Sequence, residues 1–294
     1  RLGQPTWEKA ESELQRQCME QLLRRAGLAP DALSLVFGGD LQCQCTASHY
    51  AMRQLDVPFA GLFGACSTMA EGLALAACFA ACGLADRAAA LTSSHFCTAE
   101  RQYRTPLTYG GKRTPTAQWT ATAAGAVLLT PTGRGPQVGA VCFGRVRDFD
   151  VTDINNMGAA MAPAAAETLL RFFARCGRRP EDYDAIYTGD LGFVGSRLLL
   201  EILQSEGLPL QNHQDCGLLL YDRARQQVKA GGSGAGCSAA VLAAHILPGL
   251  AKGQLHRVLL VSTGALMSQT TFLQGESIPG IAHLVELLAP GTPV

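Results

Sequence analysis

The chain has 294 residues, of which 48% are hydrophobic and 16% are charged, and its 24 basic residues balance its 24 acidic ones. This composition excludes a disordered chain, because disordered chains are poor in apolar residues and rich in net charge. The zero net charge also argues against non-specific nucleic-acid binding, which needs an excess of Lys and Arg. We expect two globular units, or one large duplicated one.

Two segments share one order of elements. Residues 20–41 and residues 167–191 each predict an amphipathic helix, a Gly-containing stop, a Pro-Asp or Pro-Glu-Asp turn, and a short apolar strand ending in Gly-Asp-Leu. Self-similarity at this scale indicates an internal repeat.

A second matching pair follows in the same order. Residues 64–94 and residues 234–264 each contain a Gly-rich turn, an Ala-rich helix, a Gly break, an Arg, and a strand ending in small hydroxyl residues. The Ala-rich helices lack a clean polar face, so we expect both to be buried. Helix–strand units of any α/β protein look alike, but two matches in the same order favour a duplication.

The repeats predict an α/β fold with two βαβαβ halves, residues 1–145 and 146–294, each built on a parallel core sheet. Stacking the halves gives a five-layer α-β-α-β-α arrangement with the two Ala-rich helices in the central layer. Small side chains there would let those helices approach closely.

The eleven cysteines are odd in number and lie in apolar contexts. With no signal-peptide pattern, we expect free thiols in a reducing compartment, no disulfide and no structural zinc. No apolar run approaches about 18–20 residues, so we expect no membrane-spanning helix.

Cys66 lies in the turn Phe63-Gly64-Ala65-Cys66-Ser67-Thr68, between a predicted strand and an Ala-rich helix. The positive end of the helix dipole should lower the pKa of a thiol placed there. The free backbone N–H groups of Ser67 and Thr68 would form an anion site at the same helix end. The alternative is a buried structural cysteine, our interpretation of the other ten.

Three further residues are candidates for the same site. His95 follows a predicted strand and is a candidate base for the thiol. Asp40 and Asp190 are related by the repeat, and the carboxyl ends of parallel strands are where α/β folds bind ligands. Capping of a turn or helix is the alternative for both. Two carboxylates could hold calcium, but no EF-hand spacing supports that, so we assign no metal ligands.

Other segments could border the pocket. Gly231, Gly232 and Ser233 form a Gly-rich turn that permits close approach to a small ligand, although it matches no phosphate-binding motif. Residues 157–164 could line its mouth. The loop 100–118 carries Arg101, Arg104, Lys112 and Arg113 with aromatic residues, and is either a solvated flap or a cover for an anionic aromatic ligand.

The duplicated halves with Cys66 at a central helix look like the thiolase fold. Longer segments resemble one family within that fold, stage V sporulation protein AD, from about Trp7 to His283. These segments are residues 63–68, 92–95, 98–102, 109–111, 161–166, 188–191, 215–218, 231–234 and 276–279. The resemblance also implies that the first strand of the first half precedes this sequence.

The resemblance implies a non-catalytic binding protein for dipicolinic acid, pyridine-2,6-dicarboxylate, free or as its calcium complex. Its partners would be membrane proteins of the same sporulation operon, which move calcium dipicolinate into the forespore and out at germination. The chain would sit peripherally on the forespore or spore inner membrane, without a cofactor, and a homodimer is possible. The predicted ligand-binding residues are Asp40, Cys66, Ser67, Thr68, His95, Thr188, Asp190, Gly231, Gly232 and Ser233.

The sequence departs from condensing enzymes where their catalytic partners belong. Thiolase-fold enzymes add a His, with a second His or an Asn, from the second half to activate the thiol and hold the oxyanion. Residues 188–192 contain no His, and residues 231–233 contain neither His nor Asn. A carboxylate beside the thiol would raise its pKa. Two alternatives remain: an acyl-CoA-dependent acyltransferase using Cys66, and a structural partner whose pocket is empty.

Overall fold

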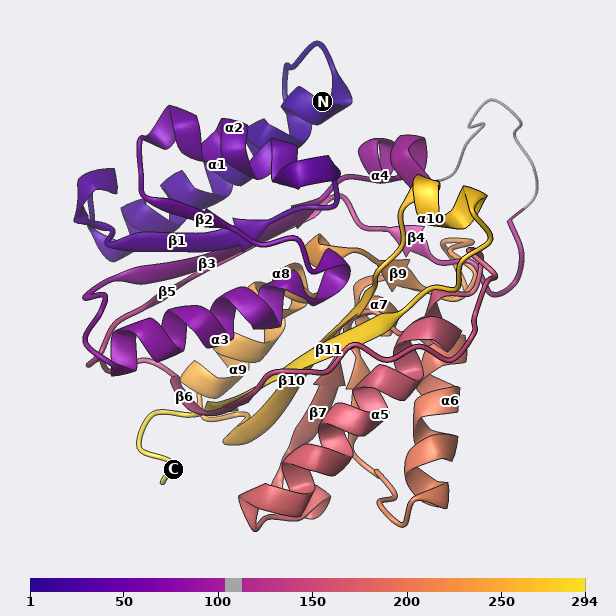
Figure 1. Cartoon of the computed structure of the whole chain (residues 1–294). Coiled ribbons are helices and arrows are strands. Elements are labelled where there is room, and N and C mark those ends of the chain that lie inside the picture. Colours follow the sequence, from indigo (N-terminus) through magenta and orange to yellow (C-terminus); the bar gives the residue numbers. More distant parts are fainter. Residues whose placement is uncertain (104–112, 294) are drawn as a thin grey trace.

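The computed structural model describes residues 1–103 and 113–293. Two β-sheets are stacked with helices between them and on both outer faces (Figure 1). This is the predicted five-layer α-β-α-β-α arrangement, and each sheet belongs mainly to one half of the chain.

Within the described residues, sheet A has the order β2-β1-β3-β5. Its strands are β1 (Leu35–Gly39), β2 (Phe59–Gly61), β3 (Ala88–Ser94) and β5 (Ala123–Leu129). The first three in this order are parallel, and β5 is antiparallel to β3. Helices α1 (Trp7–Ala26) and α2 (Thr46–Leu55) cover the outer face, where Met19 and Leu23 of α1 pack against Val36 and Leu91.

Sheet C has the order β6-β11-β10-β7-β8 within the same residues. Its strands are β6 (Gln137–Cys142), β7 (Ala185–Thr188), β8 (His213–Asp215), β10 (Arg257–Ala265) and β11 (Gly280–Leu288). Helices α5 (Met157–Cys176) and α6 (Gly192–Ser205) pack on its outer side (Figure 1). Strand β6 precedes residue 146, the predicted start of the second half, but belongs to the second sheet.

The central layer contains α3 (Thr68–Ala81) from the first half and α8 (Ala235–Val241) from the second. A π-helical turn (Leu242–Ile246) and α9 (Leu247–Ala251) continue α8. A Cβ atom on Gly236 of α8 would lie 2.3 Å from the backbone oxygen of Ala123 in β5. The small residues of the Ala-rich repeat therefore let α8 approach the backbone of sheet A, whereas the sequence predicts a close approach between the two Ala-rich helices.

Short elements complete the chain. Strands β4 (Trp119–Thr120) and β9 (Gly232–Ser233) pair in parallel and join the two halves. The remaining α-helices are α4 (Phe96–Tyr103), α7 (Cys216–Leu220) and α10 (Gln269–Leu273). All eleven cysteines are free thiols. Among the described helices, none is both long and apolar enough to cross a bilayer.

Two sequence expectations are not tested by the structure. Arg104 and Lys112 of the predicted flap lie outside the described residues. In sheet C, β6 flanks β11, whereas no described residue takes the equivalent place beside β5 in sheet A. The predicted additional strand of the first half would belong there, and it stays a prediction.

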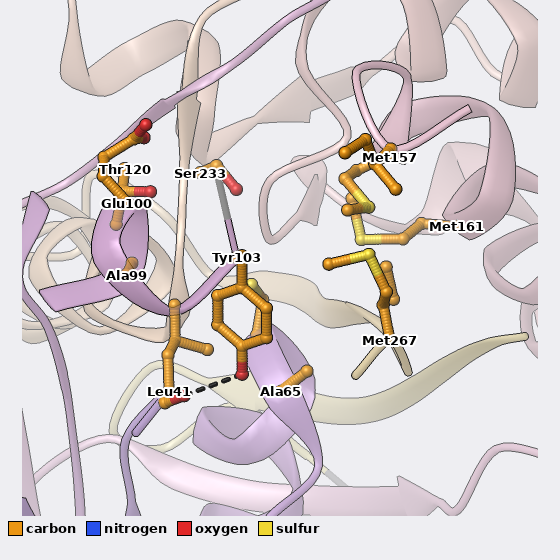
Figure 2. A pocket seen from close by; sticks show the side chains of 13 residues that line it. Leu41, Ala65, Ala99, Glu100, Tyr103, Thr120, Met157, Met161, Ser233 and Met267 are labelled. Atoms are coloured by element: carbon orange, nitrogen blue, oxygen red, sulfur yellow. Dashed lines mark hydrogen bonds between the residues drawn. The ribbon is translucent and has the colours of Figure 1, made fainter. Parts of the chain in front are cut away.

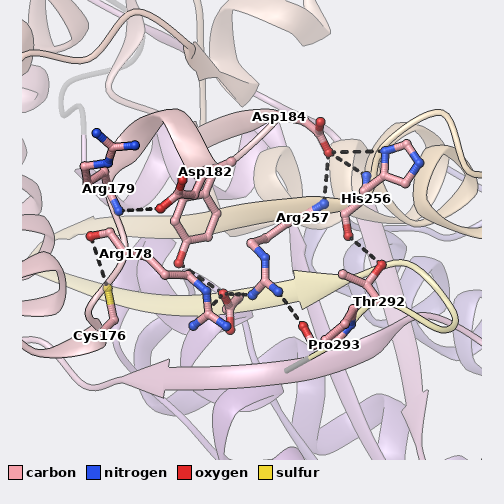
Figure 3. A network of polar contacts seen from close by, with 11 residues as sticks. Cys176, Arg178, Arg179, Asp182, Asp184, His256, Arg257, Thr292 and Pro293 are labelled. Carbon is pink, nitrogen blue, oxygen red and sulfur yellow. Dashed lines mark hydrogen bonds and ion pairs between the residues drawn. The ribbon is translucent and has the colours of Figure 1, made fainter.

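A buried carboxylate anchors the end of sheet C near the C-terminus (Figure 3). Glu286 of β11 is fully buried and accepts hydrogen bonds from Tyr183 Oη at 3.0 Å and from Arg257 Nη1 at 2.7 Å. Arg257 also donates to the backbone oxygen of Pro293. This ion pair joins β11, β10 and the turn before β7, and we assign it a structural role because it satisfies a buried charge.

Candidate functional site

A strained turn places Cys66 at the start of α3. After β2 the chain forms a 3-10 turn (Ala65–Ser67), and Ala65 has φ +52°, in the left-handed region that residues with a side chain rarely adopt. A Cβ on Gly64 would lie 2.6 Å from Glu71 Oε2 and 2.9 Å from Ser67 Oγ, so a side chain there would require both of these side chains to shift. Such backbone strain is concentrated at functional sites in proteins.

Cys66 lines a cavity of about 80 Å³ between the two halves (Figure 2). A single water molecule needs roughly 10–15 Å³ by the same kind of measure, so the cavity has room for a small molecule. In Figure 2, Met157, Met161 and Met267 lie on one side, opposite Ala99, Glu100 and Thr120. The full lining is Leu41, Ala65, Cys66, Ala99, Glu100, Tyr103, Thr120, Ile154, Met157, Met161, Ser233, Ala265 and Met267.

Asp190 is buried next to Cys66 and is not among the residues that line the cavity. Its Oδ1 accepts from Thr263 Oγ1 at 2.9 Å, and its Oδ2 accepts from the backbone N of Gly234 at 2.8 Å and from Ser233 Oγ at 3.2 Å. The Cys66 thiol donates a further hydrogen bond to this carboxylate. Burial raises the pKa of Asp190, and these hydrogen bonds oppose the rise.

The pKa of Cys66 is raised well above its usual value. Burial is the largest cause, followed by the negative charge of Asp190 and the hydrogen bond to it. The prediction that the helix dipole lowers this pKa is therefore wrong, because a half-charge at a helix end is outweighed by desolvation and a full negative charge. The predicted effect of a neighbouring carboxylate is confirmed. Near neutral pH the thiol is protonated and a poor nucleophile.

The anion site predicted at the backbone of Ser67 and Thr68 does not form as expected. The Ser67 N–H donates to the backbone oxygen of Gly64 at 3.2 Å, and the Thr68 N–H donates to the backbone oxygen of Ala65. Both side-chain hydroxyls also donate within this turn. The 3-10 turn thus uses the donors that a simple helix start would leave free.

Asp40 and His95 lie outside the cavity lining, contrary to expectation. Asp40 is fully buried and accepts from the backbone N and the hydroxyl of Ser48, at 2.8 and 2.6 Å, so it caps the first turn of α2. His95 packs against Trp7, with ring centroids 5.3 Å apart, and its Nδ1 accepts from the backbone N of Cys97. Burial lowers the pKa of His95. Neither residue hydrogen-bonds to Cys66.

Thr188, Gly231 and Gly232 also lie outside the lining. Thr188 is buried and donates to Asp215 Oδ2 at 2.7 Å, while Asp215 caps α7. The backbone oxygen of Gly232 accepts from Gln118 Nε2 at 2.9 Å, and its strand pairs with β4. Of the predicted residues, the structure brings Cys66, Asp190 and Ser233 together around one carboxylate.

Several lining residues escaped the sequence analysis, although Met157 and Met161 fall in the segment predicted to line the mouth. Ile154 and Met267 come from connections whose path no local pattern predicts, and Ala265 is the last residue of β10. Thr263 could have been predicted as a site residue, because the repeat includes a strand that ends in small hydroxyl residues. In residues 1–103 and 113–293, no group of three or more His, Cys, Asp and Glu side chains is placed to hold a metal ion.

We predict slow alkylation of Cys66. At pH 8 iodoacetamide should modify Cys66 about tenfold more slowly than the exposed Cys43, because burial and Asp190 keep the Cys66 thiol protonated. Peptide mass spectrometry over a time course gives both rates. In urea the two rates should converge, which serves as the control. Equal rates in the folded protein would contradict the raised pKa.

The comparisons with known proteins place this chain in a family. The family model for stage V sporulation protein AD matches residues 1–288. Stage V sporulation protein AD of Bacillus subtilis (strain 168) is 46% identical over 282 residues, covering 96% of this chain and 83% of the relative. The chain belongs to the stage V sporulation protein AD family. It is thus a sporulation protein, as the sequence resemblance predicts.

Two solved structures similar to this chain show its fold. A variant of OleA from Xanthomonas campestris has a TM-score of 0.62 at 14% identity, covering 95% of this chain and 82% of that one. The 3-oxoacyl-[acyl-carrier-protein] synthase III of Aquifex aeolicus VF5 has a TM-score of 0.58 at 13% identity, covering 94% and 84%. At such identities the likeness shows the fold alone, and it confirms the thiolase-like class.

Proposed function

We propose that this chain is a non-catalytic binding protein for dipicolinic acid, held in the cavity beside Cys66, Asp190 and Ser233. In this proposal it serves the movement of dipicolinate into forming spores and out at germination. It acts peripherally at the spore inner membrane with membrane proteins of the same sporulation operon. Family membership supports the sporulation role, and the cavity supports a small ligand.

The hydrogen bond from the Cys66 thiol to the Asp190 carboxylate carries the argument against catalysis. A nucleophilic cysteine needs a base that makes its thiolate available near neutral pH. Burial and the neighbouring charge of Asp190 instead raise the pKa of the thiol. No His or Asn is found among the residues that line the cavity within the described chain. The site therefore retains the position of an acyl-enzyme nucleophile while favouring its unreactive form.

The charges around the cavity bear on how a dianion would bind. Asp190 and Glu100 both repel a second anion, although Arg113 forms an ion pair with Glu100 at 2.8 Å. The guanidinium of Arg113 lies 4.4 Å from the ring centroid of Trp119, which fixes its place. A calcium ion that accompanies dipicolinate would offset the repulsion. We expect tighter binding when calcium is present.

The second candidate function is acyl transfer through Cys66. It is favoured by the strained turn at Ala65 and by the position of the thiol on the cavity wall. Incubation with acetyl-CoA followed by intact-mass analysis separates the two functions. A stable acetyl adduct on Cys66 would favour the enzyme, whereas an unmodified mass after prolonged incubation supports the binding protein.

We predict that filling the cavity weakens dipicolinate binding. Ser233→Leu places a larger apolar side chain in the lining and removes a hydroxyl beside Asp190, so affinity should fall at least about tenfold. Ser205→Leu, on the exposed end of α6, is the matched control and should bind as the wild type does. Calorimetric titration with and without calcium measures both variants.

Thermal melting of the same samples excludes unfolding as the cause. Equal affinities for Ser233→Leu and Ser205→Leu would place the ligand elsewhere on the protein. A wild-type protein that binds no dipicolinate under either condition would overturn the proposed function.

A further inference from the structure

A closed ring of hydrogen bonds joins two buried carboxylates beside the cavity. Ser93 Oγ donates to Glu11 Oε1 at 2.9 Å, and Gln42 Nε2 donates to Glu11 Oε2 at 2.8 Å. The backbone N of Gln42 donates to Asp40 Oδ1 at 2.8 Å. Ser48 Oγ donates to Asp40 Oδ2 at 2.6 Å.

Gln15 of α1 closes this ring. Its Nε2 donates to Ser93 Oγ at 2.7 Å and to Ser48 Oγ at 2.9 Å, while its Oε1 is buried without a donor. The side chains of Glu11, Gln15 and Asp40 are all fully buried. The ring therefore ties α1 to the end of β1, to α2 and to β3, and it has too few donors for all its acceptors.

Every hydrogen bond that the described residues give to the two carboxylates comes from a neutral group. The titratable groups nearby belong to other contacts. On α1 Glu8 pairs with Arg101 of α4, and at the start of α4 His95 faces Trp7. Next to Asp40 the pKa values of Cys45 and Tyr103 are raised, so both stay neutral, and His49 of α2 bonds the backbone of Cys45. Two ionised carboxylates would thus repel each other in a low-dielectric interior.

The ring is continuous with the cavity wall. Leu41 lies between Asp40 and Gln42 in sequence and lines the cavity, and Tyr103 Oη donates to its backbone oxygen at 2.7 Å. Thr98 Oγ1 donates to Glu11 Oε2 at 2.6 Å, and the next residue, Ala99, also lines the cavity. A change in the spacing of the two carboxylates would therefore move two parts of the wall.

We propose that Glu11 and Asp40 form a proton-linked latch: one proton held by the pair keeps α1 docked and the cavity wall closed, and its loss loosens both. The part of this proposal that concerns the docking of α1 does not depend on any ligand. The effect on ligand affinity rests on the proposed dipicolinate function.

The direction of the pH dependence follows from the two carboxyl groups. Burial, together with the charge of Asp40, raises the pKa of Glu11 from 4.5 to about 7, and burial raises the pKa of Asp40. The folded state then binds a proton that the unfolded state has already released, so stability falls as pH rises from about 4.5 to about 7. Above a pH of about 7 the stability that this proton contributes is fully lost.

Hydrogen exchange measured by mass spectrometry tests the latch without any ligand. After correction for the intrinsic rate, opening of α1 should increase about tenfold between pH 5.5 and pH 8. Helix α5, its counterpart on sheet C, should not change over this range. In Glu11→Gln the opening of α1 should be independent of pH. In Glu20→Gln, a change at a partly exposed residue of the same helix that removes only its ion pair with Arg16, the opening should depend on pH as in the wild type.

The outcomes separate the latch from the proposed function. A wild-type α1 that shows no more pH dependence than α5 overturns the latch, and this comparison stands even if Glu11→Gln does not fold. If the latch holds, dipicolinate affinity should fall severalfold over the same pH range in the wild type and stay constant in Glu11→Gln. Constant affinity in both, with α1 opening as expected, would overturn the link to the cavity. Absence of dipicolinate binding at every pH would overturn the proposed function. The hydrogen-exchange result for α1 would then still confirm or overturn the latch.

Discussion

Gly236→Ala is expected to lower the free energy of unfolding by about 3 kcal/mol, because it forces the two halves apart. The added methyl group would lie 2.3 Å from the backbone oxygen of Ala123 and 2.8 Å from the backbone nitrogen of Ser94. Both atoms belong to strands of sheet A, so no flexible side chain can move aside. Urea unfolding followed by circular dichroism gives the difference.

The matched control is Gly135→Ala, whose new Cβ meets no atom within 4 Å. It should change the free energy of unfolding by less than about 0.5 kcal/mol. If Gly236→Ala were as stable as Gly135→Ala, the close contact between α8 and sheet A would be wrong.

Asp190→Ala is expected to lower the free energy of unfolding by about 2 kcal/mol and to make the Cys66 thiol more reactive. Removing the carboxylate leaves the buried backbone N–H of Gly234 and the hydroxyl of Thr263 without their acceptor. Release from the desolvation cost of the carboxylate offsets part of this loss. Because the neighbouring negative charge is gone, the pKa of Cys66 should fall and its alkylation at pH 8 should become faster.

Asp190→Asn is the matched variant for these two effects. It keeps an acceptor of the same shape, so its loss of stability should be smaller, yet it also removes the charge and should speed alkylation of Cys66. Unchanged alkylation in both variants would show that burial alone controls the thiol. The role assigned to Asp190 would then be contradicted.

The layers of the fold could be predicted because both copies of the sequence repeat show the same order of helices and strands. Each Ala-rich helix occupies the centre, and each Gly-Asp-Leu segment follows a parallel strand. The repeat misled the site prediction, however, because equivalent backbone positions do not fix equivalent side-chain partners. Asp190 accepts hydrogen bonds from Cys66 and Gly234, whereas Asp40 accepts hydrogen bonds from Ser48 and caps the first turn of α2.

The chemistry of Cys66 needed the three-dimensional structure. Sequence position alone indicates the helix dipole, which acts locally and predicts a reactive thiol. The raised pKa of Cys66 comes first from burial between the halves and then from Asp190, 124 positions later in the chain. Likewise, the sequence predicts Asp40 as a pocket residue, but Asp40→Arg should unfold the chain, because Asp40 lies in the buried ring with Glu11.

Protection of Cys66 by ligand tests the central claim most directly. The wild-type protein is alkylated for several hours at pH 8 with increasing dipicolinate, and the modification of Cys66 and Cys43 is followed in the same digest. The proposed site predicts that the rate at Cys66 falls with a saturating dependence on dipicolinate, while the rate at the exposed Cys43 stays constant. An unchanged rate at Cys66, at concentrations where calorimetry detects binding, would contradict a ligand site in this cavity.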